Sequence, residues 1–223
     1  MALAASLPKY VQISERLIRE IAAGHLTDGA RLPPERDMAA ELGISVGTLR
    51  KALSDLDAKG MLTRVQGSGN YIRAGDAAGS VYAFFRLEKP GGGGLPGAEI
   101  LSVRPRSGRP DCRVRRTRLL DGRAVALEEI FFEAGGRDVA ESDLSESLYL
   151  YYRDTLGRSV VSVEDTIAID RMPDWGPLSA RAPCGHVMRI GRDGDGKVLE
   201  ISQTWFDPAR AAYVSRMGSG KRV

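Results

Sequence analysis

The chain of 223 residues contains only two cysteines and two histidines, which limits the chemistry that it can support. Cys112 and Cys184 form neither a CxxC pair nor a metal-ligand spacing, so we interpret them as reduced thiols. His25 and His186 stand in no spacing typical of nucleophilic or metal-assisted catalysis. We therefore predict no catalytic residues, no metal site and no cofactor.

Long apolar segments and a strong excess of one charge are also missing. No apolar run approaches the length that a membrane-spanning helix needs, and the N-terminus lacks the pattern of a signal peptide. The formal net charge is only +3, which excludes a polybasic nucleic-acid coat but allows a few phosphate contacts. We expect a cytoplasmic protein with one large or two modest domains and no membrane partner.

The stretch from residue 32 to residue 72 predicts two short helices followed by a β-hairpin. The first helix is expected to begin near Pro34, because proline is tolerated in a first helical turn, and to end at Gly43. Ser45 is a good N-cap for the second helix. Residues 61–66 and 70–73 are expected to be strands around the Gly67-Ser68-Gly69 turn. The second helix should bury a row of leucines: Leu49, Leu53 and Leu56.

Polar and basic side chains lie off this buried face, near the beginning of the second helix. A recognition helix presents its base-contacting side chains from that end. The residues concerned are Thr48, Arg50 and Lys51. Upstream, apolar residues at helical spacing predict an amphipathic helix that packs under the recognition unit: Tyr10, Ile13, Leu17, Ile18 and Ile21.

This ordered combination resembles the winged helix-turn-helix of the GntR family of bacterial transcription regulators. The resemblance covers residues 10–72 and includes YVQI at 10–13, L-P-x-E-R at 32–36, LGIS at 42–45, TLRKAL at 48–53 and GSGNYI at 67–72. It implies that Arg36, Ser45, Thr48, Arg50 and Gly67 contact double-stranded DNA. Three neighbours complete the predicted DNA-binding set: Val46, Lys51 and Ser68.

The beginning of the recognition helix departs from the family pattern. An arginine commonly follows the position of Ser45, but this chain has Val46-Gly47 instead. This change removes a side chain suited to guanine, since bidentate pairing of arginine with guanine is the commonest specific contact. Val46 would instead contact a thymine methyl group. Because of this departure, the family pattern does not predict the base sequence of the operator.

The composition divides the chain into a DNA-binding domain at residues 1–73, a linker at residues 74–80 and a second domain at residues 81–217. The second domain is predicted to be a mixed α+β domain with an antiparallel sheet. Its expected strands are residues 81–87, 99–104, 112–120, 124–132, 159–168, 187–191 and 198–206. Its expected helices are residues 142–156 and a short piece at residues 178–182.

One strand of this domain concentrates charge on a half-buried face. The period of two in CRVRRTRLL places Arg116 and Arg118 on the face of Val114 and Leu120. Buried arginines need anionic partners, which are either a ligand or the glutamates at positions 128, 129 and 200. The Ser145-Glu146-Ser147 stretch, at the start of the predicted helix, is a second place that favours an anion.

The second domain resembles the UTRA effector domain of the HutC subfamily of GntR regulators, whose fold is similar to chorismate lyase. The resemblance rests on R-T-R at 116–118, D-G at 121–122, A-L-E at 126–128, S-L-Y at 147–149 and V-L-E-I-S at 198–202. In sugar-phosphate-binding members, the arginines and the serine hold the phosphate and the glutamates contact the rest of the ligand. The implied effector site is Arg116, Arg118, Glu128, Ser147 and Glu200, to which Arg86 would add a further positive group.

The hairpin at Asp121-Gly122 leaves one alternative open. A two-residue turn would place Glu129 on the arginine face, whereas a three-residue loop would place Glu128 there.

The resulting hypothesis is a homodimeric regulator, most simply a repressor, that binds a palindromic operator. A small anionic metabolite bearing a phosphate, carboxylate or sulfonate would release it. Two alternatives are an enzyme with a chorismate-lyase-like domain and a DNA-binding module whose second domain only dimerises.

Overall fold

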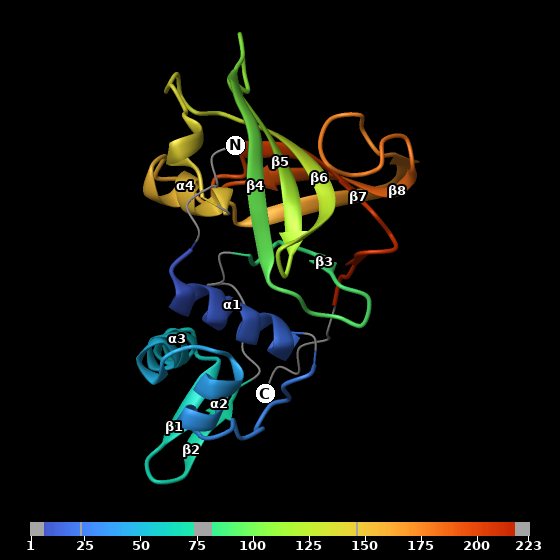
Figure 1. Cartoon of the computed structure of the whole chain (residues 1–223). Coiled ribbons are helices and arrows are strands. Elements are labelled where there is room, and N and C mark those ends of the chain that lie inside the picture. The colour runs from blue at the N-terminus through green and yellow to red at the C-terminus, as the bar shows by residue number, and fades with distance from the viewer. Residues whose placement is uncertain (1–6, 23, 74–81, 146, 217–223) are drawn as a thin grey trace.

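The structure is a computed structural model that describes residues 7–22, 24–73, 82–145 and 147–216. The predicted linker at residues 74–80 and the predicted domain limits at residues 81 and 217 lie outside these ranges. The N-terminal domain is a winged helix-turn-helix (Figure 1), as the sequence predicts. Its elements are α1 (Lys9–Ala22), α2 (Glu35–Glu41), α3 (Val46–Ala58), β1 (Leu62–Val65) and β2 (Gly69–Ile72).

The ends of α2 and α3 confirm the predicted turn chemistry. Pro34 is the N-cap of α2, and Gly43 has a φ of +62° in the turn that follows it. Ser45 is the N-cap of α3, where its hydroxyl accepts a hydrogen bond from the backbone N–H of Thr48 at 3.1 Å. This cap satisfies one of the free N–H groups at the start of the helix, and therefore fixes where α3 begins.

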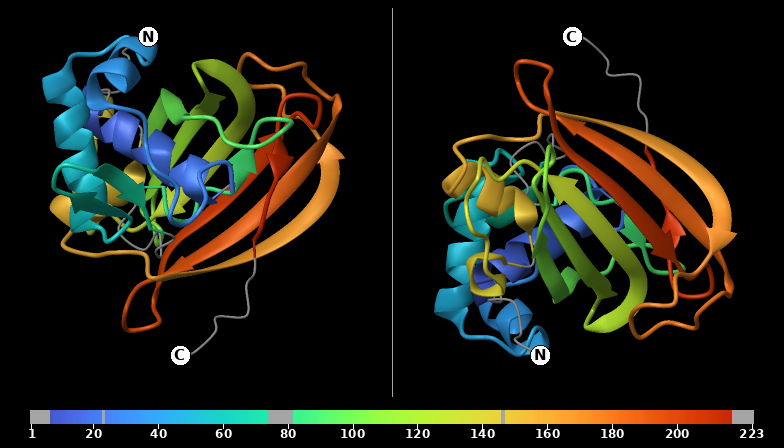
Figure 2. Two further views of the ribbon diagram at one scale, coloured as in Figure 1. Left: turned by 90° about the horizontal axis from the view of Figure 1, so that it is seen from below. Right: turned by 90° about the horizontal axis from the view of Figure 1, so that it is seen from above.

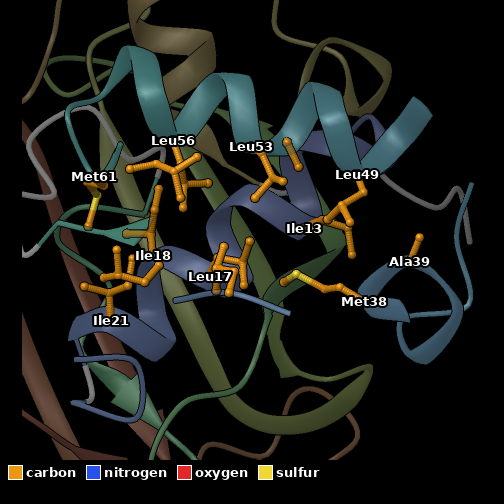
Figure 3. Close-up of a cluster of buried hydrophobic side chains, with 14 residues drawn as sticks. Ile13, Leu17, Ile18, Ile21, Met38, Ala39, Leu49, Leu53, Leu56 and Met61 are labelled. Atoms are coloured by element: carbon orange, nitrogen blue, oxygen red, sulfur yellow. The ribbon is translucent and has the colours of Figure 1, made fainter. Parts of the chain in front are cut away.

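The core of the winged helix lies between α1 and α3 (Figure 3). Leu49, Leu53 and Leu56 of α3 are at most 1% exposed and face the apolar side of α1. Burial of each of these side chains contributes about 1.5–3 kcal/mol. The α1 residues opposite them are Ile13, Leu17, Ile18 and Ile21.

The second domain is built on a curved six-stranded antiparallel sheet (Figure 2), which confirms the predicted α+β class. The strand order is β4-β5-β6-β9-β8-β7, so β4 and β7 are the edges. The strands are β4 (Pro96–Pro105), β5 (Cys112–Leu120), β6 (Arg123–Phe132), β7 (Ser162–Arg171), β8 (Pro183–Arg192) and β9 (Val198–Phe206). Smaller elements are β3 (Leu87–Glu88), η2 (Glu141–Asp143), α4 (Leu148–Asp154) and β10 (Ala212–Tyr213).

The predicted strand at residues 81–87 is wrong. The described part of this segment begins with a turn at residues 82–84, and only Leu87–Glu88 pairs as a strand, with β10. The aromatic residues Tyr82 and Phe85 line a cavity instead of alternating across a sheet. In addition, the carbonyl groups of Phe85 and Leu87 accept hydrogen bonds from Arg19 of α1 rather than from a neighbouring strand.

The predicted helices of the second domain are shorter than expected or absent. The expected helix at residues 142–156 is interrupted, because the backbone at Leu144 is extended, and α4 begins only at Leu148. Glu146 of the predicted helix start lies outside the described residues. No helix forms at residues 178–182, where Arg181 has a φ of +60° that a right-handed helix does not allow.

Several of the predicted strands have different limits in the structure. β4 runs over residues 96–105 rather than 99–104, and β6 begins at residue 123 rather than 124. β7 runs over residues 162–171 rather than 159–168, and β8 runs over residues 183–192 rather than 187–191. The two strands pair from Ser162 opposite Arg192 to Arg171 opposite Pro183. Pairing along this whole length extends β8 beyond its apolar centre, which was the only part that the sequence pattern predicted.

The hairpin between β5 and β6 shows whether Glu128 or Glu129 lies on the face of the arginines. Leu120 pairs with Arg123, which leaves a two-residue turn, yet Arg116 lies opposite Glu128. The short turn and this pairing are compatible because the register shifts between Arg118 and Leu119, where a β-bulge inserts one extra residue into β6. Glu128 therefore faces the arginines although the turn is short.

Candidate DNA interface and effector pocket

The predicted DNA-contacting side chains of α2 and α3 are accessible. Arg36 near the start of α2 is exposed, as are Arg50 and Lys51 of α3. Arg50 Nε donates to Glu35 Oε2 at 2.7 Å, so a contact of Arg50 with DNA would have to replace this ion pair. Thr48 and the capping hydroxyl of Ser45 are hydrogen-bonded to each other at 2.9 Å.

Val46, at the start of α3, is only partly accessible. Its side chain is half-buried and packs against the hydrophobic core of the winged helix. Its contact with a thymine methyl group stays a prediction.

A groove separates the start of α2 from the wing, the hairpin formed by β1 and β2. Residues 31–35 line one side of the groove, and residues 64–70 line the other. Arg31 and Arg64 both lie along it, and sequence reasoning missed both of them. Arg64 donates to Ser54 Oγ of α3 at 2.7 Å, which ties the wing to the predicted recognition helix. Guanidinium groups along such a groove suit contacts with the DNA backbone.

Gly67 lies at the exposed tip of the wing with a φ of +74°. Its neighbour Ser68 forms a hydrogen bond with the hydroxyl of Tyr71 at 2.6 Å, which braces the turn. No heavy atom lies within 4 Å of a Cβ atom built on Gly67, so the backbone angle alone argues against a side chain here.

We expect Gly67→Val to lower the affinity for the operator while the second domain stays folded. A β-branched residue at positive φ strains the turn, and its side chain obstructs close approach to the DNA. A gel-shift titration measures the change, with Gly136→Val in a loop of the second domain as the matched control, because Gly136 also has a positive φ of +75° and open space around it. Equal affinity of wild type and Gly67→Val would remove the wing from the interface.

The second domain contains a buried pocket that collects five of the six predicted effector residues. Arg116, Arg118, Glu128, Ser147 and Glu200 all line this cavity, which we call the effector pocket. The sixth, Arg86, lines a neighbouring cavity that shares Phe85, Glu128 and Arg189 with the effector pocket. Sequence reasoning missed other lining residues: Tyr82, Phe85, Tyr149 and Arg189.

Ion pairs organise the three arginines of the effector pocket. Arg116 Nε donates to Glu128 Oε2 at 2.6 Å, and Arg189 forms two hydrogen bonds of 2.6 Å with Asp165. Arg118 Nε lies 3.7 Å from the same Glu128 oxygen that Arg116 engages. Burial and the neighbouring Arg116 lower the pKa of Arg118 to about 10. The guanidinium remains charged at neutral pH, and an added anion would stabilise it.

Glu200, the second carboxyl group of the effector pocket, has different hydrogen-bond partners from Glu128. It accepts hydrogen bonds from the hydroxyls of Tyr149 at 3.0 Å and Tyr152 at 2.9 Å. Burial raises the pKa of Glu200, whereas Arg116 and Arg118 lower the pKa of Glu128 in spite of its burial. The effector pocket therefore holds two carboxyl groups in different environments, one paired with arginines and the other with tyrosine hydroxyls.

Ser147 lies at the start of a helix, as the sequence predicts, while its contact with an anion stays a prediction. It is the residue before α4 and is 4% exposed. Its backbone N–H donates to Ser145 Oγ at 3.3 Å. The short α4 therefore brings one hydroxyl group to the wall of the effector pocket.

No metal-binding cluster of three or more His, Cys, Asp or Glu residues occurs in the described ranges. No helix within those ranges is long and apolar enough to span a membrane.

A winged helix-turn-helix joined to an α+β domain that encloses a charged pocket defines a DNA-binding transcription regulator with an effector domain. Residues 9–72 match the gntR family of bacterial regulatory proteins, and residues 98–212 match the UTRA domain. The chain belongs to the GntR family, with the combination of domains that the sequence analysis predicted.

Similar proteins agree with this assignment. The HTH-type transcriptional regulator SmoD from Agrobacterium fabrum is 48% identical over 227 residues, covering 95% of this chain and 97% of SmoD. The HTH-type transcriptional repressor NagR from Bacillus subtilis is 29% identical over 232 residues, covering 95% of each chain. The crystal structure of the possible transcriptional regulator YydK from Bacillus subtilis has the same fold, with a TM-score of 0.53, 19% identity and coverage of 95% of this chain and 100% of YydK. SmoD and NagR are named as transcriptional regulators, which favours the regulator over the enzyme alternative.

Proposed function

We propose that this regulator is a repressor that binds a palindromic operator as a homodimer in the cytoplasm, and that a small anionic metabolite releases it. The main support for an anionic ligand is the position of Arg118, which is 2% exposed in the effector pocket beside a second arginine. Arginine forks bind phosphate, carboxylate and sulfonate groups through charge-assisted hydrogen bonds.

Two further observations support the rest of the proposal. The name of NagR says that this relative is a repressor. The edge strand β7 exposes two large apolar side chains, Ile167 at 54% and Ile169 at 88%. An exposed apolar edge strand favours pairing with a second copy. A symmetric dimer in turn binds two symmetric half-sites.

Thermal unfolding with a panel of metabolites tests the ligand class. Each anion is measured beside its neutral counterpart, for example glucose 6-phosphate beside glucose. We expect at least one anion to raise the Tm by about 5–10 °C at a concentration of 100 times its Kd, and its neutral counterpart to have no effect.

Two results would contradict the proposal. Stabilisation by neutral compounds alone would overturn the anionic class. If no compound stabilised a dimer that bound DNA, the second domain would act only in dimerisation.

A further inference from the structure

The helix α1 of the DNA-binding domain lies against the effector domain near β3 (Figure 1). Arg19 of α1 makes this contact: its two terminal nitrogens donate to the carbonyl oxygens of Phe85 at 3.3 Å and Leu87 at 2.5 Å. Arg19 is 8% exposed, so the contact encloses a charged group between the two domains.

The charge of Arg19 is compensated in this position. The negative charges of Glu88 and, to a smaller extent, Glu15 counteract the effect of burial on Arg19. Glu88 is itself held by two hydrogen bonds from Arg216, at 2.5 and 2.9 Å, and by the backbone N–H of Gly93 at 3.2 Å. Burying Arg19 is therefore favourable only while residues 85–88 keep this arrangement, since an uncompensated buried charge is costly.

Phe85 connects Arg19 with the effector pocket. The guanidinium carbon of Arg19 lies 5.2 Å from the centre of the Phe85 ring, and that of Arg118 lies 4.4 Å from the same ring. Both distances are within the range of cation–π interactions. One aromatic side chain thus contacts a cation of the DNA-binding domain and the central cation of the effector pocket.

The effector pocket is too small for a metabolite in this arrangement. Its cavity measures about 40 Å³, and the neighbouring cavity measures about 30 Å³. A single water needs roughly 10–15 Å³, so the effector pocket has room for only a few waters. A ligand larger than this must displace part of the wall. Strands of the sheet and the start of α4 form most of that wall, whereas Tyr82 and Phe85 belong to a turn and a short connecting segment.

From these contacts we infer that Phe85 and the segment around it relay occupancy of the effector pocket to the winged helix. A ligand on Arg118 displaces Phe85, which moves the carbonyl groups that hold Arg19, and α1 is released from the effector domain. Because α1 packs on α3, the whole winged helix moves with α1 when α1 is released. The distance between the winged helices of the two protomers can then change. This relay rests on the proposed anion site at Arg118.

The relay predicts a reciprocal effect that can be measured without DNA. If ligand binding has to break the Arg19 contact, removal of that contact must strengthen ligand binding. Simple electrostatics predicts the opposite sign, because Arg19→Ala removes a positive charge near an anion site. The direction of the change therefore separates the two explanations.

The experiment is calorimetric titration of glucose 6-phosphate and inorganic phosphate into the full chain. Glucose 6-phosphate exceeds the size of the cavity, whereas inorganic phosphate is close to it. We expect Arg19→Ala to bind glucose 6-phosphate about fivefold more tightly than wild type, a factor at the low end of allosteric couplings, and to bind phosphate no more tightly. Arg16→Ala is the matched control: it removes the same charge from an exposed position of α1, and both affinities should stay unchanged.

Amide hydrogen exchange of residues 82–88 provides a second readout. Exchange should be faster in unliganded Arg19→Ala than in wild type, and glucose 6-phosphate should accelerate it in wild type. Arg19→Lys covers the case in which the alanine variant does not fold. Lysine keeps the charge but cannot donate from a fork to both carbonyl groups, so the same changes are expected at smaller size.

The outcomes that overturn the relay are distinct from those that overturn the anion site. If Arg118→Ala removes binding of glucose 6-phosphate but Arg19→Ala binds it as Arg16→Ala does, the anion site stands and the relay is wrong. If neither glucose 6-phosphate nor inorganic phosphate binds wild type, or if both bind Arg118→Ala equally well, the site at Arg118 does not hold a phosphate group, and the relay stated for that group is wrong as well.

Discussion

Arg118→Ala is expected to abolish binding of the anionic effector while operator binding is retained, giving a repressor that cannot be induced. Arg118 is 2% exposed in the effector pocket, and the like charge of Arg116 acts on it, so an incoming anion would offset the repulsion between the two arginines. We therefore expect Arg118 to provide the strongest contact with an incoming anion. A charge-assisted hydrogen bond contributes about 1.5–3 kcal/mol, so the loss of one bond weakens binding about 10- to 150-fold, and the loss of a fork weakens it further.

Arg115→Ala is the matched control for this prediction. Arg115 lies on the same strand but on the opposite face, where its Nε donates to Glu129 at 2.7 Å. Calorimetric titration should show unchanged ligand affinity in Arg115→Ala and none in Arg118→Ala. Equal affinity in both variants would remove Arg118 from the effector site.

The stability of the unliganded Arg118→Ala variant tests whether Arg118 has only a structural role. If Arg118 served only to brace the sheet against Glu128, its removal should lower the Tm. However, burial and the like charge of Arg116 lower the pKa of Arg118, so the guanidinium is disfavoured where it lies. We expect the Tm to stay within a few degrees of wild type. A large fall with ligand binding preserved would favour the structural explanation.

Arg36→Ala is expected to weaken operator binding by about 1–3 kcal/mol, or roughly 5- to 150-fold, the scale of a lost arginine contact with DNA. Arg36 is exposed in the first turn of α2. Arg50→Ala should cost less, because Arg50 must first leave Glu35, with which it pairs at 2.7 Å. If Arg36 contacts a phosphate, its removal should also reduce the slope of log affinity against log salt by about 1.

Fluorescence anisotropy with an operator selected from random duplexes provides the measurement. Arg123→Ala is the control, since it removes the same charge from an exposed position of the effector domain. Equal affinity of Arg36→Ala and Arg123→Ala for the operator would show that the DNA does not contact Arg36.

Local signals predicted the winged helix well because its limits depend on neighbouring residues. The cap at Ser45, the turn at Gly43 and the leucine face of α3 are all consequences of short-range sequence. The period of two likewise predicted that Arg116 and Arg118 share a face of β5. The convergence of Ser147 and Glu200 on those arginines required the family resemblance, because α4 and β9 are far from β5 in the chain.

Long-range pairing accounts for what the sequence did not predict. Arg189 could have been found by the same alternation, since it follows Val187 on one face of β8. The bulge that brings Glu128 to Arg116 depends on how β6 pairs with its neighbour, which no local pattern encodes. The aromatic segment at residues 82–85 has strand-like composition, but its Phe85 ring contacts Arg19 and Arg118 from two different domains, and such long-range contacts leave no local signal.

The most direct test of ligand-controlled DNA release is an anisotropy titration of the operator complex with the anion that most stabilises the protein. Wild type and Arg118→Ala are compared at the same fraction of bound DNA. We expect the anion to lower the operator affinity of wild type at least fivefold, the low end of typical allosteric couplings, and to leave that of Arg118→Ala unchanged. Equal release of DNA from both proteins, or no release from either, would contradict this expectation.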